Sequence, residues 1–385
     1  MIPYGRQSIS EEDVQAVVEV LRSDFLTQGP VVPTFEQAVA ESVGTHHAVA
    51  VNSATSALHI ACIALGLGPG DLLWTVPNTF LASANCALYC GADVGFVDVD
   101  PDTWNLSVPD LARRLDDAQR AGRLPKVVVP VAFAGQSCDM RGIKALADRY
   151  GFHVLEDASH AIGGRYNGKP VGCGDYADIT VFSFHPVKIV TSAEGGMAVT
   201  RDAKLAAAMR LFRSHGMTRD PQQMERPSHE AWYYEQVALG YNYRMTELQA
   251  ALGLSQMKRL SAFVERRHAI ARRYDNLLEG LPVVTQRAEP GAHSALHLYP
   301  VRLNAPARRH RVFDAMRDAG IGVNVHYIPV HLQPHYRRMG FAAGDFPNAE
   351  DYYAGAISLP IFFDLADRAQ DEVVSALREA IGRAD

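Results

Sequence analysis

The most informative stretch of the chain is Phe182-Ser183-Phe184-His185-Pro186-Val187-Lys188. Its first residues end an apolar run, residues 179–184, which predicts a strand covered on both faces. A lysine just beyond such a strand has a lowered pKa in apolar surroundings, because burial disfavours the charged ammonium. Its free amine can then attack an aldehyde. Taken alone, Lys188 is better explained as a solvent-facing loop residue, so the rest of the chain has to decide.

Strands and helices alternate on both sides of this stretch, from about residue 34 to residue 200. The expected strands are residues 47–52, 72–76, 94–97, 126–131, 153–156 and 179–184, and the expected helices are residues 34–43, 55–65, 80–89, 111–121 and 140–150. This alternation predicts an α/β fold with a mostly parallel sheet and right-handed crossovers. Ligands of such sheets bind at the carboxyl ends of the strands.

After Thr246 the pattern changes. One or two long helices are expected within residues 246–277, strands at residues 297–303 and 322–327, and helices at residues 308–319 and 369–381. We therefore expect a large ligand-binding domain, residues 1–250, followed by a smaller C-terminal α+β domain, residues 251–385.

The composition excludes several classes of protein. The 385 residues are 48% hydrophobic and 21% charged, and the formal net charge of −6 is spread along the chain. These values are typical of a packed globular protein, and because there is no basic stripe we expect no nucleic-acid partner. No apolar run approaches the roughly 18 residues that cross a bilayer. The N-terminus lacks the apolar region of a signal peptide, so we expect no association with a membrane.

The cysteines and histidines predict no metal site. Five cysteines are scattered through apolar segments, which favours reduced thiols in the cytoplasm over a disulfide framework. Cys86 and Cys90 could share a helix face, but no second pair or nearby histidine completes a zinc site. His326, His331 and His335 are also regularly spaced, yet the prolines between them break any helix that would align them.

Two further motifs suit a ligand site at the edge of the sheet. Residues 52–57, Asn-Ser-Ala-Thr-Ser-Ala, lie where a strand turns into a helix, and their N–H groups and hydroxyls suit a phosphate. Alternatively, Ser53 or Thr55 simply caps the helix. Asp157 follows another strand and either caps the next helix or holds a cationic ring nitrogen. A phosphate cradle, an acidic residue and a lysine on one sheet edge are together what pyridoxal phosphate requires.

Several ordered motifs identify a family resemblance over nearly the whole chain. They are Asp24-Phe25-Leu26-Thr27-Gln28-Gly29-Pro30, residues 156–160, residues 183–196, Gly240-Tyr241-Asn242-Tyr243-Arg244-Met245, His326-Tyr327-Ile328-Pro329 and Ser358-Leu359-Pro360. With these motifs the chain resembles the DegT/DnrJ/StrS family of sugar aminotransferases. The resemblance implies the fold of aspartate aminotransferase, which is fold type I of the pyridoxal-phosphate-dependent transferases.

The resemblance also implies a role for each matching residue. Lys188 would carry the cofactor covalently and move the proton between it and the sugar, and Asp157 would pair with the pyridinium nitrogen. The other cofactor contacts would come from Ala54, Thr55, Phe80, His160, Ser183 and Asn242. Asn242 would reach the phosphate of a second subunit, so we expect a homodimer with shared sites. For Phe80 an ordinary core position, and for His160 a satisfied interior histidine, are the alternatives.

Within the family, residues 183–188 and 325–332 look most like the C4 aminotransferases of pseudaminic acid synthesis. This likeness implies L-glutamate as amino donor and a UDP-linked 4-keto-6-deoxy-N-acetyl-hexosamine as acceptor. The product would be UDP-4-amino-4,6-dideoxy-N-acetyl-β-L-altrosamine. The substrate contacts implied are Tyr4, Phe25, Leu26, Thr27, Gln28, Ala54, Ser183, Asn242, Val325, His326, Tyr327 and Ile328.

Three other functions remain open at this point. The first is another nucleotide-sugar C4 aminotransferase, making a D-configured 4-amino sugar of the bacillosamine, legionaminate or perosamine type. The second is a cofactor-dependent sugar dehydratase, which in this family carries histidine where this chain has Lys188. The third is a non-catalytic regulator or sugar-binding protein, which would be expected to have lost Lys188 or Asp157.

Overall fold

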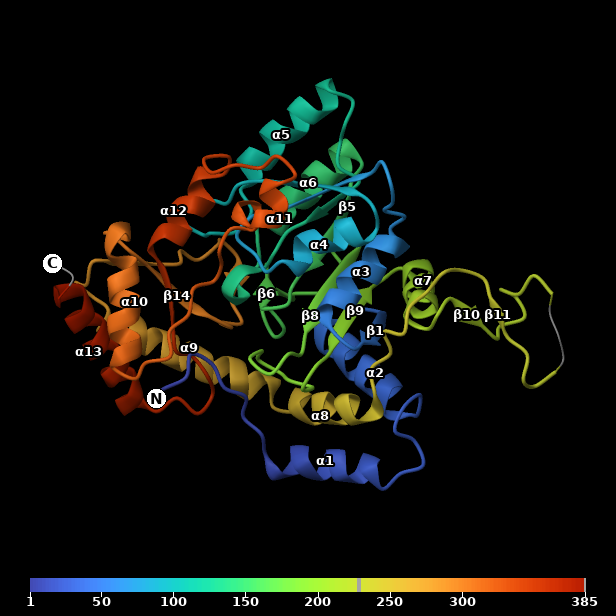
Figure 1. Cartoon of the computed structure of the whole chain (residues 1–385). Helices are drawn as coiled ribbons and strands as arrows, with labels where there is room; N and C mark the ends of the chain where they lie inside the picture. Colours follow the sequence, from blue (N-terminus) through green and yellow to red (C-terminus); the bar gives the residue numbers. More distant parts are fainter. Residues whose placement is uncertain (227–229, 384–385) are drawn as a thin grey trace.

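The computed structural model describes residues 1–226 and 230–383, and its centre is a seven-stranded sheet surrounded by helices (Figure 1). The strands lie in the order β1-β9-β8-β5-β4-β2-β3. Their bounds are β1 His47–Val51, β2 Leu72–Thr75, β3 Asp93–Phe96, β4 Val127–Val129, β5 His153–Asp157, β8 Ile179–Ser183 and β9 Gly196–Thr200. The five strands from β8 to β3 run parallel, which confirms the predicted mostly parallel α/β sheet.

Strand β9 was not predicted, and it makes one side of the sheet antiparallel. It pairs antiparallel with β8 on one side and with β1 on the other. The chain therefore leaves β8, passes through the loop that holds Lys188, and returns at once into the sheet. A return of this kind is a hairpin connection and needs no crossover helix, so the strand–helix alternation gave no sign of it.

The helices of the large sheet agree with the predicted ones to within a few residues. They are α2 Val31–Val43, α3 Ala54–Ala64, α4 Ala82–Tyr89, α5 Val108–Arg120 and α6 Met140–Tyr150, whereas α7 Ala203–Arg213 was not predicted. Local signals explain the agreement at α6. Asp139 caps its first turn by accepting the N–H of Gly142, and Gly151 ends it with a φ of 80° that suits glycine.

The C-terminal third forms a second sheet with its own apolar core, as predicted. Strands β12 Val283–Thr285, β14 Tyr299–Leu303 and β15 Ala356–Leu359 pair antiparallel and pack against α9 Leu260–Leu277, α10 Arg309–Asp318 and α13 Asp367–Arg383. Helix α9 contributes Phe263 to the core of the large sheet and Ile270 to the core of the small one. A domain boundary at residue 250 stays a prediction.

The strand predicted at residues 322–327 is wrong. Only an isolated bridge between Asn324 and Ser358 forms there. The side chains of this segment bond elsewhere, because His326 Nδ1 lies 2.8 Å from Ser358 Oγ and Tyr327 Oη lies 3.1 Å from His160 Nε2. His326 is thus tied to β15 of the small sheet while Tyr327 reaches the edge of the large sheet, so the segment bridges the two sheets and forms no strand.

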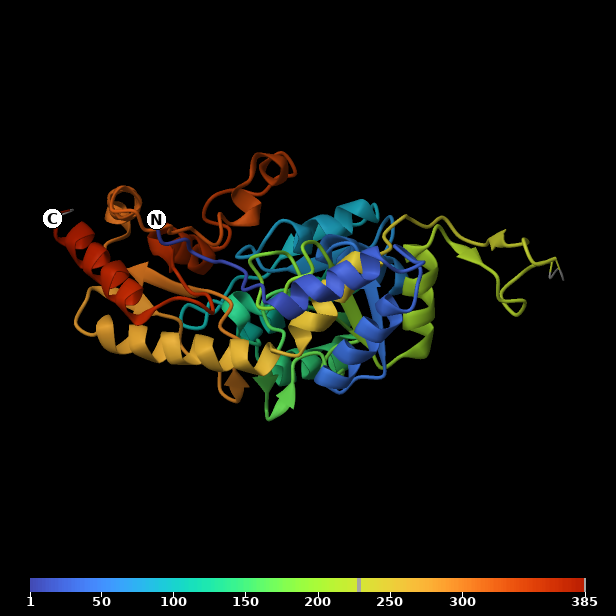
Figure 2. The ribbon, with the colours of Figure 1, turned by 90° about the horizontal axis from the view of Figure 1, so that it is seen from below.

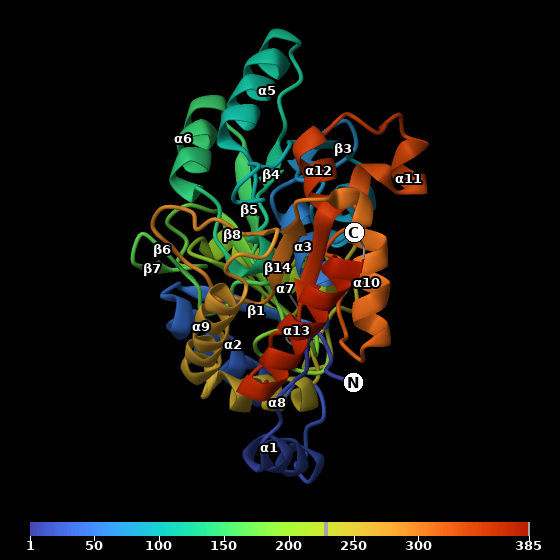
Figure 3. The same cartoon turned by 90° about the vertical axis from the view of Figure 1, so that its left-hand side faces the viewer.

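The remaining elements are short or lie outside the two sheets. Helix α1 Glu11–Leu21 packs on α8 Glu247–Met257 at the outside of the molecule (Figure 3). Strands β10 Met217–Thr218 and β11 Glu235–Gln236 form an arm that projects away from the body (Figure 2). The others are β6 Arg165–Tyr166, β7 Lys169–Pro170, β13 Ala292–His293, α11 Pro334–Arg337, α12 Pro347–Gly355 and the 3₁₀ turns at Phe133–Gly135, Pro306–Arg308 and Val330–Leu332. Among the residues described, no helix combines the length and apolarity needed to span a bilayer.

A buried cation ties together the segments that precede β14 and follow β15. Arg267 in α9 is 3% exposed, and its Nη1 lies 3.0, 3.1 and 3.2 Å from the carbonyl oxygens of Leu296, His297 and Ile361. Burial lowers the pKa of this guanidinium to about 10. Three carbonyls from two segments thus depend on one side chain for their hydrogen bonds.

Replacing Arg267 by methionine should destabilise the protein by about 3–5 kcal/mol, because it leaves those carbonyls buried without donors. Urea denaturation followed by circular dichroism measures the change in the free energy of unfolding. The control is Arg272→Met on the same helix, which removes an exposed guanidinium and should stay within about 0.5 kcal/mol of the parent. Equal effects of the two substitutions would contradict the role of Arg267.

Candidate active site

A cavity of about 840 Å³ opens where β1, β5 and β8 end. Ten of the residues predicted for the site line it: Tyr4, Ala54, Thr55, Phe80, Asp157, His160, Ser183, Lys188, His326 and Tyr327. They come from segments up to 323 residues apart, between Tyr4 and Tyr327. The sheet edge thus brings together both predicted catalytic residues and most of the predicted cofactor contacts.

Seven predicted residues do not line this cavity, namely Phe25, Leu26, Thr27, Gln28, Asn242, Val325 and Ile328. Residues 25–28 and Asn242 are exposed and belong to neighbouring segments, because Thr27 forms a backbone bridge with Thr246. Val325 and Ile328 flank the lining residues His326 and Tyr327. Residues 25–28 and Asn242 are thus placed outside the cavity.

One lining residue that the sequence did not reveal is His297. Its ring centroid lies 4.4 Å from that of His160, and its Nδ1 is buried without a hydrogen-bond partner. Burial lowers the pKa of His297 well below its ordinary value, with Lys188 and His160 adding to the effect. No local motif marks this residue, since it reaches the cavity only through the packing of the small sheet against the large one.

The first turn of α3 forms one end of the cavity. Ser53 caps this helix, its Oγ accepting the N–H of Ser56 at 3.1 Å, so the capping interpretation is correct for Ser53. The next two N–H groups, of Ala54 and Thr55, lie in the first turn, where helix geometry provides no intrahelical acceptor. With the hydroxyls of Thr55 and Ser183 on the same wall, this end suits a phosphate.

A glycine of β9 allows the close packing behind this turn. A Cβ at Gly196 would lie 2.5 Å from the backbone nitrogen of Ala54 and 2.5 Å from the carbonyl of Ser53. Real Cβ atoms do not approach backbone so closely, so any larger residue would displace the first turn of α3. The position of the phosphate end therefore depends on the absence of a side chain at residue 196.

Asp157 lies at the other end of the cavity as a fixed hydrogen-bond acceptor. Its Oδ2 accepts the hydroxyl of Ser83 at 2.6 Å, and its Oδ1 accepts the N–H of Ser159 at 3.0 Å. No helix begins directly after Asp157, so it is not the helix cap that was the alternative. Two donors hold the carboxylate in one orientation while it faces the cavity.

Lys188 is not a solvent-facing loop residue. It lines the cavity and is only partly accessible. Burial lowers the pKa of its amine to about 8, although the nearby Asp157 acts in the opposite direction. An appreciable fraction of the amine is therefore unprotonated at mildly alkaline pH, as a nucleophile requires.

His160 and Tyr327 form the wall between these two ends. Tyr327 Oη lies 3.1 Å from His160 Nε2, while His160 Nδ1 is buried without a partner. Burial, with the charge of Lys188, lowers the pKa of His160 well below its ordinary value, so the ring is neutral. Phe80 is 58% exposed and sits 6.3 Å from the Tyr327 ring, which rules out a core position for it.

The residues present fit pyridoxal phosphate. The helix turn and hydroxyls suit its phosphate, Asp157 suits its ring nitrogen, and the Lys188 amine lies within the same cavity. Phe80 offers an exposed aromatic face, and His160 has an unpartnered ring nitrogen. Each chemical group of this cofactor has a matching group in the wall.

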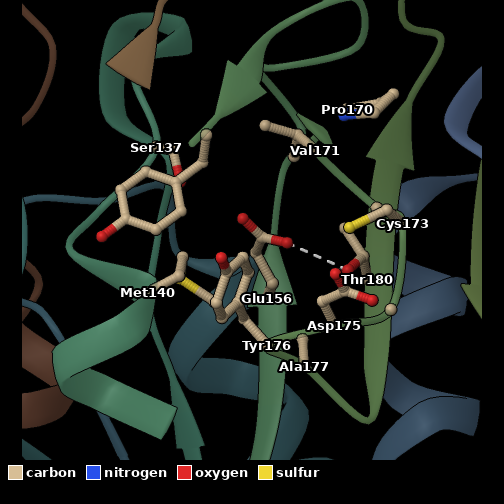
Figure 4. A pocket seen from close by; sticks show the side chains of 13 residues that line it. Ser137, Met140, Glu156, Pro170, Val171, Cys173, Asp175, Tyr176, Ala177 and Thr180 are labelled. Atoms are coloured by element: carbon tan, nitrogen blue, oxygen red, sulfur yellow. Dashed lines mark hydrogen bonds between the residues drawn. The ribbon is translucent and has the colours of Figure 1, made fainter. Parts of the chain in front are cut away.

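A second carboxylate, Glu156, lies on the opposite face of β5 from Asp157. Figure 4 shows it between Met140, Tyr176 and Cys173, with Thr180 donating to its Oε2 at 2.9 Å. The small cavity around it, about 10 Å³, has room for roughly one water molecule. Burial raises the pKa of Glu156 to about 7, against the hydrogen bond from Thr180.

Gly196→Ala should weaken the binding of pyridoxal phosphate at least about tenfold, or about 1.4 kcal/mol, because the new methyl group displaces the first turn of α3. Titration of the protein with the cofactor, followed by its absorbance, measures the dissociation constant. Gly68→Ala is the matched control, since a Cβ there meets open space. Unchanged affinity in Gly196→Ala would contradict the close packing described above.

Glu156→Gln should alter how stability depends on pH. The folded protein holds the Glu156 proton up to about pH 7, whereas the ordinary pKa is 4.5. Between these values only the folded state keeps the proton, so the free energy of unfolding falls as the pH rises, by on the order of 3 kcal/mol in total. Glutamine does not titrate, so the variant should gain about that much relative to the parent between pH 4.5 and 7.5.

Urea denaturation at several pH values tests this difference, with Glu265→Gln, an exposed position, as the control. The control should keep a constant difference from the parent at every pH. A constant difference for Glu156→Gln as well would mean that Glu156 ionises normally in the folded protein.

Comparison with known proteins gives the same result as the site. The chain matches the DegT/DnrJ/EryC1/StrS aminotransferase family over residues 7–378. It is 40% identical over 390 aligned positions to the spore coat polysaccharide biosynthesis protein SpsC of Bacillus subtilis, covering 100% of this chain and 98% of SpsC. It is 37% identical over 363 positions to the UDP-4-amino-4,6-dideoxy-N-acetyl-β-L-altrosamine transaminase of Campylobacter jejuni, covering 94% and 92%.

Solved structures agree over the whole chain. Helicobacter pylori PseC, an aminotransferase involved in the biosynthesis of pseudaminic acid, superposes with a TM-score of 0.91 at 31% identity and 99% coverage of both chains. Spr1654 of Streptococcus pneumoniae in its PLP form superposes with a TM-score of 0.90 at 28% identity, covering 100% and 99%. Transaminases of this kind depend on pyridoxal phosphate, the cofactor that the cavity fits. The chain therefore belongs to the DegT/DnrJ/EryC1/StrS aminotransferase family.

Proposed function

We propose that the protein transfers the amino group of L-glutamate to C4 of a UDP-linked 4-keto-6-deoxy-N-acetyl-hexosamine. The product is UDP-4-amino-4,6-dideoxy-N-acetyl-β-L-altrosamine, an intermediate of pseudaminic acid synthesis. The observation that carries the proposal is the single cavity that joins the Lys188 amine, the Asp157 carboxylate and the first turn of α3. The 37% identity to a transaminase with this product and the likeness to PseC support the choice of sugar.

Lys188 is the group that moves protons in this reaction. When bound, pyridoxal phosphate supplies an electron-withdrawing ring that stabilises negative charge on the carbon losing its proton. The Lys188 amine, with its lowered pKa, would accept that proton on Nζ from the carbon that loses the amine and deliver it to the carbon that gains the amine. The same side chain serves glutamate and sugar, so the two substrates react in turn.

Asp157 and His160 orient the ring. The two donors on Asp157, Ser83 and the Ser159 N–H, leave its carboxylate directed at the cavity, where it keeps a ring nitrogen protonated. His160 is held by Tyr327 and, being neutral, can donate one N–H without adding a positive charge beside Lys188. The phosphate would be held by the Ala54 and Thr55 N–H groups and by Ser183.

The sugar nucleotide occupies the part of the cavity beyond the ring. Tyr4, His326 and Tyr327 line that part and offer hydroxyl and imidazole groups to a sugar. Burial lowers the pKa of His326 to about 3, so it acts as a neutral donor or acceptor. Val325 and Ile328 complete the segment that we assign to the substrate.

We also propose a homodimer in which each subunit completes the site of the other. Asn242 and residues 25–28 are exposed and lie outside their own cavity, as expected of groups that serve a neighbouring one. The arm of β10 and β11 carries Trp232 at 69% and Leu239 at 79% exposure. Large apolar side chains on a projecting arm are typical of a surface that another chain covers.

The five free cysteines suit a reducing compartment, and we place the enzyme in the cytoplasm.

The alternative is a C4 aminotransferase acting on a D-configured keto sugar. The higher identity, 40%, is to a protein of spore coat polysaccharide synthesis, whose name specifies neither acceptor. The chemistry at Lys188 would be the same, and only the fit of the acceptor against Tyr4, His326 and Tyr327 would differ. A dehydratase is disfavoured because Lys188 is present, and a non-catalytic protein because Lys188 and Asp157 are both in place.

The test is an assay of the purified protein with L-glutamate and, separately, the L- and D-configured UDP-4-keto sugars. We expect 2-oxoglutarate and the altrosamine product with the L-configured acceptor. Lys188→Ala should lower the rate at least roughly 10²–10⁴-fold, while Lys204→Ala, which changes an exposed lysine, should leave it unchanged. Turnover of the D-configured sugar alone would establish the alternative, and turnover by Lys188→Ala at the parent rate would refute both.

A further inference from the structure

A buried histidine of helix α3 lies against the segment that carries Asn242. His59 is 5% exposed, and its Nδ1 lies 3.1 Å from the hydroxyl of Tyr243. The centroid of the Tyr241 ring lies 4.7 Å from that of the imidazole. This ring also stacks on the ring of Tyr243, at 4.9 Å and an interplanar angle of 13°. His59 lines no part of the active-site cavity, so its contacts point to a role outside the reacting atoms.

The extended backbone directs the two tyrosines to one side and Asn242 to the other. Neighbouring residues of an extended segment point their side chains to opposite faces. Tyr241 and Tyr243 both contact the buried His59 and pack against the core of the large sheet. The side chain between them, that of Asn242, is exposed. The asparagine therefore faces outward because the tyrosines on either side of it are held inside.

Backbone hydrogen bonds attach this segment on both of its edges. On one edge, the N–H of Tyr243 donates to the carbonyl of Arg213, at the end of α7, at 3.0 Å. On the other edge, the carbonyl of Tyr243 accepts the N–H of Asn52 at 2.9 Å. Asn52 directly precedes Ser53, the cap of α3. The segment is thus attached to α3 twice, through the backbone just before the helix and through the side chain of His59 within it.

The side-chain attachment matters because the segment is not part of a regular strand. Asn242 forms only an isolated bridge, with Ser214, and the structure has no ladder at this point. A stretch with few backbone hydrogen bonds opens locally more easily than a strand within a sheet. The hydrogen bond and the ring contacts of His59 therefore contribute to the order of the segment from which Asn242 projects.

We propose that His59 and Tyr243 are positioning residues, whose hydrogen bond holds Asn242 in the orientation that reaches the cofactor phosphate of the second subunit. The inference rests on the homodimer proposed above. The first turn of the same helix carries the N–H groups of Ala54 and Thr55, which suit the phosphate of its own subunit. Each α3 would then serve two sites, its own through the first turn and the neighbouring one through His59.

The experiment measures the dissociation constant of pyridoxal phosphate by absorbance titration, at protein concentrations at which sedimentation shows the dimer. Tyr243→Phe removes the hydroxyl and keeps the ring. Binding should weaken about two- to tenfold, which is the net effect of one hydrogen bond. Pyridoxal, which lacks the phosphate, should bind to this variant and to the parent with equal affinity, whereas a general loss of structure would weaken both ligands.

A double variant separates this role from support of the first turn of α3. Asn242→Ala should weaken the binding of pyridoxal phosphate at least as much as Tyr243→Phe does. The variant with both substitutions should bind no more weakly than Asn242→Ala alone, because the hydroxyl acts through the asparagine. If the hydroxyl served only the first turn of its own helix, the two losses would add.

Substitutions of His59 provide the rescue and the control. His59→Leu should lose as much affinity as Tyr243→Phe, while His59→Asn keeps a polar group in place of Nδ1 and should bind nearly as the parent does. Tyr89→Phe is the matched control and should not change the dissociation constant. Its ring also contacts His59, at 5.4 Å, but within residues 1–226 and 230–383 its hydroxyl makes no hydrogen bond.

The outcomes that would overturn the proposal are distinct from one another. Unchanged affinity in Asn242→Ala would refute the shared site of the proposed dimer, and the positioning role with it. Weaker binding by Asn242→Ala but not by Tyr243→Phe would refute the positioning role alone. Additive losses in the double variant would do the same, since the shared site would stand without any help from Tyr243.

Discussion

The parallel course of β4, β5 and β8 is the constraint on which the active site depends. Neighbouring parallel strands end at the same edge, so Asp157, the last residue of β5, and Ser183, the last of β8, come together without any contact between distant loops. β9 then returns beside β8 and presents Gly196 to the first turn of α3. The positions of the carboxylate and of the helix turn thus follow from backbone pairing in the sheet.

Much of this could be predicted because its signals are local. Apolar runs marked the parallel strands, and Asp139 and Gly151 marked both ends of α6. Asp157 ends β5 and Lys188 lies in the loop after β8, and their roles could be assigned only from their combination with the phosphate cradle and from the family resemblance. Ser53 shows the limit of such assignments. The sequence offered helix capping and phosphate binding as alternatives, whereas in the structure Ser53 caps α3 and the N–H groups of Ala54 and Thr55 stay without an intrahelical acceptor.

The remainder depends on contacts that no short segment contains. β9 belongs to a hairpin. The segment of residues 322–327 forms no ladder, because its side chains bond outside the strand pairing, as Tyr327 does to His160. His297 precedes β14 and reaches the cavity with its carbonyl held by Arg267 of α9. The residues of the site that the sequence missed are therefore those placed by packing between the two sheets.

The loop that carries Lys188 is held at both of its ends and also inside. The Phe184 N–H bonds to the Gly195 carbonyl at 2.9 Å, and the Phe184 carbonyl accepts both the Ser192 N–H and the Thr191 hydroxyl. A loop anchored in this way loses little conformational entropy when a ligand is attached to it. Attaching the cofactor therefore orders little additional polypeptide, and most of the binding free energy stabilises the bound molecule.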